Sequence, residues 1–196
     1  RPPGSTLFPY TTLFRSVVLG ERGIISLRYN SEVMITIGID PAFRKTGFAI
    51  ATLDETGEVE GRMFRSLLDF IQWVESREWP GQTVVVGVEN SNLQNVTFNM
   101  KGTKGEIARR SRNAGANQAA SQYTVDYCRH FFGREYVFEI SPRDKGGKWT
   151  QAMFRQVLKQ EGHRTAGKFN QDQRDAYQIA LHAKKLAFFQ AAKINQ

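Results

Sequence analysis

Apolar and polar residues alternate along the chain in two different periods, which divide it into strand-like and helix-like segments. Short runs rich in β-branched and other apolar residues predict five strands, at 34–40, 47–54, 58–64, 83–90 and 135–141. The segment between the second and third runs, DETGE, is typical of a tight hairpin turn. The fourth run is almost entirely apolar, which predicts a central strand buried on both faces.

Helical spacing dominates the longer segments. It predicts four helices, at 66–79, 114–132, 150–159 and about 170–190. In the last of these, Ala176, Ile179, Ala180 and Ala183 share one face. Residues 91–112 are polar, basic and glycine-containing without a clear period, so we expect a loop there, and a second basic loop at 142–149.

The order of these elements predicts the fold class. Three strands joined in sequence, followed by alternating helices and strands, indicate an α/β fold with a mixed five-stranded sheet. We expect three antiparallel strands, then parallel additions, with helices on both faces. This is the element order of the ribonuclease H-like fold, and a fold alone does not give a function.

The N-terminal segment is set aside. Residues 6–16, TLFPYTTLFRS, match the translation of a common sequencing-adapter oligonucleotide. Residues 1–33 are therefore interpreted as an artefactual or disordered extension, and residues 34–196 as a single domain. The extension holds four arginines and two glutamates, so the remaining chain keeps a net charge of +6 out of +8.

The positive charge favours an acidic partner, and nucleic acid is the first candidate. No apolar run approaches the length of a membrane span, and no signal peptide is evident. Cys128 is the only cysteine, which excludes an internal disulfide and fits a reducing compartment. We therefore expect a cytoplasmic protein.

Four carboxylates fall at positions where ligand sites are often built. Asp40 and Glu89 end two predicted strands, and mixed α/β sheets place ligands at such ends. Asp172 and Asp175 lie three residues apart, so they are neighbours on the last helix and repel one another. A divalent cation between the carboxylates would offset this repulsion. The alternatives are that turns recruit aspartate freely and that the pair marks a solvated helix face.

The donor types decide which cation fits. Carboxylate oxygens suit Mg²⁺ or Mn²⁺. A zinc site would need clustered histidine or cysteine. His130, His163 and His182 are scattered along the chain, so each is interpreted as structural or as a surface residue.

Five motifs in order resemble those of the RuvC-like Holliday-junction resolvases. They span residues 34–185 and read IGIDPAFRKTGFAI, VVVGVEN, GANQAASQY, FEISPRDKGGKW and DQRDAYQIAL. Ala42 stands where that family usually has glycine, and the spacing of the lysines after Pro142 is altered.

The resemblance implies a metal-dependent endonuclease of phage or prophage type that cuts four-way DNA junctions. Two ions would hydrolyse the phosphodiester, one activating water and the other stabilising the leaving oxygen. Asp40 would bridge both ions, with Glu89, Asp172 and Asp175 completing the shells. Two alternatives stay open: a ribonuclease H-like nuclease acting on RNA–DNA hybrids or flaps, and a non-catalytic DNA-binding protein on the same fold.

Basic residues after Pro142 and in 91–112 are candidates for contact with DNA. Lys145 or Lys148 would either neutralise charge on the reacting phosphate or steer the DNA backbone. The remaining candidates for phosphate contact are Lys101, Lys104, Arg109, Arg110, Arg112 and Arg143. Phe98 is interpreted either as a wedge between bases at the branch point or as a core residue.

Symmetric cutting of a four-way junction needs two active sites, so the resemblance also implies a homodimer. The small residues at 114–127 would allow two helices to approach closely. The alternative is that this face packs on the sheet of its own chain.

Overall fold

All five predicted strands are present in the computed structural model, which describes residues 34–43, 48–79, 81–94 and 101–194. They form one mixed sheet in the order β3-β2-β1-β4-β5. The β1–β2 and β2–β3 pairs are antiparallel, and the β1–β4 and β4–β5 pairs are parallel, as expected. The strands are β1 (Met34–Asp40), β2 (Phe48–Leu53), β3 (Val59–Phe64), β4 (Thr83–Glu89) and β5 (Val137–Ile140).

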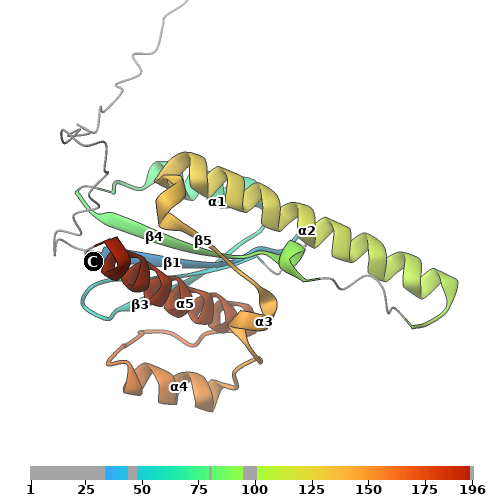
Figure 1. Ribbon diagram of the computed structural model, residues 1–196. Helices are drawn as coiled ribbons and strands as arrows, with labels where there is room; N and C mark the ends of the chain where they lie inside the picture. The colour runs from blue at the N-terminus through green and yellow to red at the C-terminus, as the bar shows by residue number, and fades with distance from the viewer. Residues whose placement is uncertain (1–33, 44–47, 80, 95–100, 195–196) are drawn as a thin grey trace, which may run out of the picture.

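Helices cover both faces of the sheet (Figure 1). The helices α1 and α2 lie on one face, and α5 lies on the other, with α4 packed outside it. Within the described part of the chain, no helix is long and apolar enough to cross a membrane. The helices are α1 (Leu67–Ser76), α2 (Lys104–Phe132), α3 (Pro142–Lys145), α4 (Gln151–Gln160) and α5 (Gln171–Ile194), with 3₁₀ turns η1 (Ser91–Leu93) and η3 (Arg134–Tyr136).

The two central strands divide their residues between two cores. Ile37 and Ile39 of β1 lie in the core under α1 and α2, together with Val86 and Val88 of β4. Because side chains alternate across a strand, the residues between them face α5. The all-apolar β4 is therefore buried on both faces, as the sequence predicts.

A pair of glycines lets α5 lie directly on the sheet. Gly38 of β1 is paired with Gly87 of β4. A Cβ atom on Gly38 would lie 2.0 Å from the carbonyl oxygen of Ala176, and one on Gly87 would lie 2.8 Å from Cβ of Ala183. The predicted apolar face of α5 is thus confirmed, and its backbone touches β1 and β4 where no side chain intervenes.

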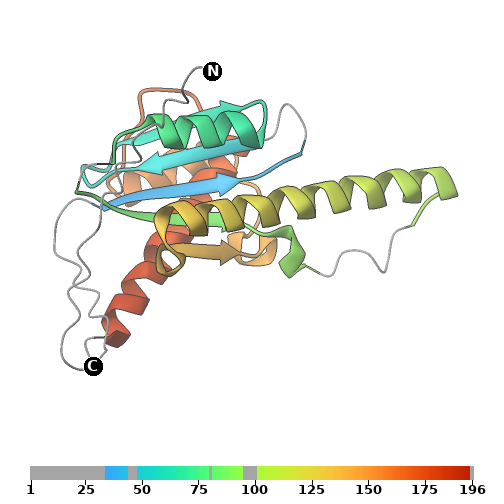
Figure 2. The same cartoon turned by 90° about the horizontal axis from the view of Figure 1, so that it is seen from above.

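The prediction of a loop throughout 91–112 is wrong, because α2 begins at Lys104. Thr103 and Glu106 form a capping box: Thr103 Oγ1 accepts from the Glu106 amide at 3.3 Å, and Glu106 Oε2 accepts from the Thr103 amide at 2.9 Å. The first half of α2 projects beyond the sheet as an arm, which we define as residues 104–119 (Figure 2). Most of its residues are exposed, so it carries no apolar stripe to detect.

The second predicted loop also contains a helical turn. Ser141 caps α3 by accepting from the Asp144 amide at 3.2 Å, and Pro142 occupies the first turn. This turn brings Lys145 back towards α5, where Gln178 Nε2 donates to the carbonyl oxygens of Lys145 and Gly147.

Candidate metal centre

Two of the four predicted carboxylates are brought together by the register of the sheet. Asp40 and Glu89 each lie two residues beyond the paired Gly38 and Gly87. The period of a strand therefore puts both on the face that α5 covers, at the carboxyl ends of neighbouring parallel strands.

The position of Asp175 follows from the same contact. It directly precedes Ala176, whose carbonyl oxygen lies against Gly38. Asp175 is only 2% exposed, and its Oδ1 accepts from Gln171 Nε2 at 2.6 Å. Asp172, one turn earlier, is only partly buried, as expected for the outer member of the pair.

Lys145 lies among these carboxylates. Its Nζ atom is 2.5 Å from Glu89 Oε2 and 3.4 Å from Asp175 Oδ2. Burial pushes the pKa of Lys145 down, but Asp40, Glu89 and Asp175 outweigh it, so the net shift is upward and the ammonium stays charged. The structure thus separates the two candidate lysines, since Lys148 is exposed.

Asp40 is the carboxylate most affected by its surroundings. Burial, followed by the charge of Glu89, raises its pKa to about 8, with smaller contributions from Asp175 and Asp172. Lys145 opposes this shift. The pKa of Asp172 is also raised, first by burial and then by Asp175, while Lys148 lowers it. All four predicted acids are therefore close enough to interact electrostatically.

Sequence reasoning missed the polar side chains that hold this arrangement. Arg174 Nε donates to the Trp149 carbonyl oxygen at 3.0 Å, and its Nη2 donates to Gln171 Oε1 at 2.8 Å. Gln178 anchors the lysine turn to α5. The available signal was the spacing of Gln171, Asp175 and Gln178, which puts three polar residues on one helix face.

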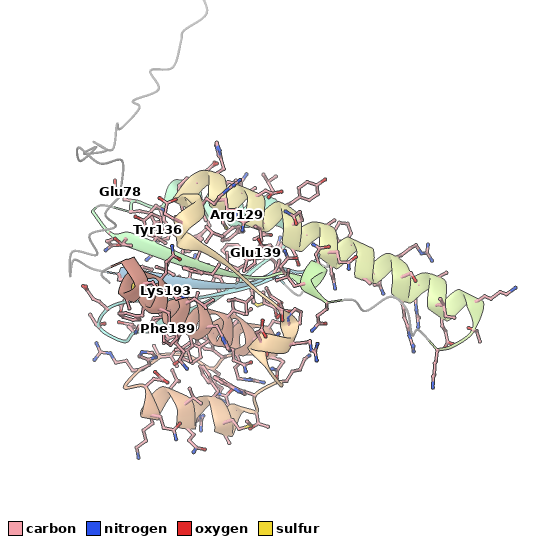
Figure 3. The ribbon with its side chains drawn as sticks, viewed as in Figure 1. Glu78, Arg129, Tyr136, Glu139, Phe189 and Lys193 are labelled. Carbon is pink, nitrogen blue, oxygen red and sulfur yellow. The ribbon has the colours of Figure 1, made fainter. Side chains whose placement is uncertain are left out.

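A second missed group fixes the end of β4. Asn90 is 2% exposed, and its Nδ2 donates to Glu139 of β5. Glu139 in turn forms an ion pair of 2.5 Å with Arg129 of α2, and Figure 3 labels both side chains. The Ser91 hydroxyl lies 3.1 Å from the Ser121 hydroxyl of α2, within hydrogen-bond distance. The strand end that carries Glu89 is thus tied to β5 and α2.

The donor set is suited to a hard divalent cation. Glu89 Oε2 is buried and lies against the Lys145 ammonium. As the side chains lie, no three acidic, histidine or cysteine residues among those described are placed to hold an ion. Lys145 instead supplies the positive charge between Glu89 and Asp175. Carboxylate oxygens are the ligands that Mg²⁺ and Mn²⁺ prefer, so the acidic residues around Lys145 fit such an ion chemically.

The chain was also compared with protein families, curated proteins and solved structures. No match was found in any of the three. The chemistry of the site therefore rests on the residues and geometry described above.

The remaining predicted residues lie on the arm or just before it, on α3, or outside the described range. Lys101, exposed before α2, accepts a 2.9 Å hydrogen bond at its carbonyl oxygen from Arg110 Nη1. Arg143 is exposed on α3 beside the site. Phe98 lies outside the described residues. The exposed basic residues of the arm itself are Lys104, Arg109, Arg110 and Arg112.

Proposed function

We propose that the chain is a RuvC-like nuclease of the ribonuclease H-like fold, a metal-dependent endonuclease that cuts branched DNA, with four-way junctions as its substrate. The observation that carries the proposal is the convergence of Asp40, Glu89 and Asp175 on Lys145 at one edge of the sheet. Burying three acids beside one lysine is costly for a purely structural purpose. Such a cluster is typical of sites that bind divalent cations and phosphate.

In this proposal Asp40, Glu89, Asp172 and Asp175 hold the Mg²⁺ or Mn²⁺ ions. Two bound ions would supply the activated water and the stabilisation of the leaving 3′ oxygen. Gln171 and Arg174 keep the aspartate face of α5 oriented. Lys145 balances the carboxylate charge without metal, and in this proposal it would neutralise charge on a bound phosphate.

The basic arm supports DNA as the partner. It projects past the end of the sheet where β4 ends (Figure 2). Its exposed cations lie in its outer part, between residues 104 and 112. A homodimer would present two such centres to a four-way junction, and the small residues of 114–119 are exposed enough to contribute to its interface. From Ala120 onward, the buried face of α2 packs on the sheet instead.

The test compares Asp40→Asn with the exposed control Asp126→Asn. With Mg²⁺ we expect the wild type and the control to cleave synthetic four-way junctions, and Asp40→Asn to bind them without cleavage. Mg²⁺ should raise the Tm of the wild type and of the control, and leave that of Asp40→Asn unchanged. Full cleavage by Asp40→Asn would overturn the mechanism. Binding without cleavage by the wild type would favour the non-catalytic alternative. Faster cleavage of RNA–DNA hybrids or flaps than of four-way junctions would favour the other nuclease alternative.

A further inference from the structure

A basic cavity lies outside the candidate metal centre, between α4 and the segment 163–168 that leads into α5. Its volume is about 540 Å³. Arg155 and Lys159 contribute from α4, four residues apart and therefore on one helix face, and Arg164 and Lys168 contribute from the segment. Among the residues that the structure describes, no carboxylate lines the cavity.

These four cations have no acidic partner in the part of the chain that the structure describes. None of their side chains takes part in an ion pair or a hydrogen bond found there. Glu161 and Asp54 act electrostatically on His163 at the rim, but neither lines the cavity. Four like charges around one hollow repel one another, and an anion between them would remove that repulsion.

The cavity is built on packed structure. Its floor includes Phe154 and Leu158, which are buried against Phe169 and Tyr177. The segment is fixed to the hairpin, because the Val59 amide donates to the Arg164 carbonyl oxygen at 2.8 Å. The backbone that carries the four cations is therefore held in place by core packing and by this hydrogen bond.

A chain of hydrogen bonds connects this cavity to the metal centre. Arg174, which lies between Asp172 and Asp175 on α5, donates from Nη1 to Gln151 Oε1 at 3.0 Å. Gln151 also lines the cavity. The same Nη1 atom donates to the Phe169 carbonyl oxygen at 2.6 Å, directly after Lys168. The first turns of α5 thus join both sites.

We propose that this cavity binds the phosphate groups of a nucleic-acid backbone and holds a DNA strand on the α4 side of the carboxylates. Free phosphate shares the same chemistry. The nucleic acid is favoured because all four cations are exposed on long side chains, as in grooves that follow a charged backbone. The position of the strand relative to the cleaved bond rests on the proposed function, whereas the binding itself does not.

The experiment compares Arg155→Gln/Lys159→Gln with a control of equal charge change, Lys185→Gln/Lys193→Gln. Both control residues are exposed, and Lys193 lies near the far end of α5, on the same helix as Phe189 (Figure 3). Glutamine keeps a good helix propensity. Binding of duplex and four-way junction DNA is measured in EDTA over a range of salt, so that no cleavage is required.

We expect the cavity variant to bind DNA about tenfold more weakly near 0.15 M salt, and to lose about one to two units of salt slope. The control should stay within about twofold of the wild type. Lys168→Gln is a second variant, outside the helix, that should shift binding in the same direction. Unchanged Tm values establish that each variant is folded.

The inference is overturned if the cavity variant and Lys168→Gln bind DNA as the control does. It is also overturned if inorganic phosphate raises the Tm of the wild type alone while DNA binding stays the same in all variants, since the cavity is then an ion site. Failure of the proposed function gives a different result. In that case the wild type cleaves no DNA with Mg²⁺, while the cavity variant still loses DNA affinity.

Discussion

Lys145 determines the charge balance of the candidate centre at the scale of a single residue. Its ammonium contacts Glu89 and Asp175 and lowers the pKa of Asp40, while only 9% of its side chain is exposed. Removing one partner from a buried ion pair costs about 3 kcal/mol or more, because the other charge is left uncompensated.

Lys145→Met keeps an unbranched side chain that is one atom shorter and removes the charge. In EDTA at pH 8 we expect its free energy of unfolding to fall by about 3 kcal/mol, measured by denaturant unfolding. Mg²⁺ should restore more stability to this variant than to the wild type, because a bound cation replaces the missing charge. Lys148→Met is the matched control, since Lys148 is exposed and should change stability little. Equal losses in both variants would contradict this account.

Some residue-level features follow from the sequence and others do not. The greater burial of Asp175 relative to Asp172 is predicted correctly, because Asp175 directly precedes the alanine face. The choice between Lys145 and Lys148 cannot be made from the sequence, since both lie in one basic segment. It depends on the short α3 turn, which buries Lys145 against Glu89 and Asp175 and leaves Lys148 exposed, where it acts on Asp172.

At the scale of elements, the contact between α5 and the sheet positions the aspartates. A Cβ atom on Gly38 would meet backbone atoms of α5, which cannot move aside as a flexible side chain can. The contact is therefore a strict requirement for the placement of Asp175.

Gly38→Ala tests this contact. We expect it to lower the free energy of unfolding by about 3 kcal/mol, because overpacking forces the backbone to shift. The matched control is Gly115→Ala, where an added Cβ meets none of the described residues within 4 Å and alanine favours the helix. That variant should be slightly more stable. A Gly38→Ala variant with wild-type stability in thermal and denaturant unfolding would show that α5 does not lie so close to β1.

The basic arm carries a prediction of its own. Arg109→Gln/Arg112→Gln should weaken binding to duplex and branched DNA alike, with a salt slope reduced by about one unit for each lost phosphate contact. Circular dichroism should show an unchanged helix content. The Lys185→Gln/Lys193→Gln control removes the same charge from α5. Loss of affinity for branched DNA alone would mean that these arginines contact the branch point and not the duplex arms.

The arm also shows where element prediction reaches its limit. Hydrophobic periodicity detects a helix through the face that it buries, and residues 104–119 bury almost none. A local signal was nonetheless present, since Thr103 and Glu106 have the spacing of a capping box. The strands β1, β2 and β4 were predicted well because nearly all of their residues are buried, so each is a short run of mostly apolar residues.

At the scale of the whole molecule, the order of elements predicts the α/β sheet and its layers. It does not predict the basic cavity, because Arg155, Lys159, Arg164 and Lys168 are brought together by the packing of Phe154 on Phe169. Such a cavity depends on tertiary contacts that leave no period in the sequence.

The same region links the stability of the whole molecule to pH. His163 Nδ1 lies 2.7 Å from the Tyr177 hydroxyl, where it joins the end of α4 to α5. Burial lowers the pKa of His163, and Lys184 of α5 lowers it further, while Glu161 and Asp54 act in the opposite direction. The folded pKa is therefore below 6.5, the value expected in the unfolded chain.

The sign of the pH effect follows from this shift. Below about pH 6.5 the unfolded chain takes up a proton on His163 more readily than the folded chain does, so the free energy of unfolding falls as the pH falls. Asp40 acts in the opposite sense between about pH 4 and 8, because its pKa is raised from 3.8 to about 8 and the folded chain holds that proton more tightly than the unfolded chain. The two contributions can be separated, since substitution of His163 leaves Asp40 unchanged.

His163→Gln keeps a polar group beside Tyr177 and cannot titrate. Urea unfolding between about pH 7.5 and 5 gives the free energy of unfolding of both proteins. As the pH falls, His163 lowers this free energy in the wild type only, so the difference between wild type and variant should become smaller. At pH 7.5 the variant should be the less stable protein, because the neutral histidine packs and hydrogen-bonds there without any cost of charging. A gap that widens with acid would mean that His163 gains stability on protonation, with Glu161 and Asp54 outweighing burial and Lys184.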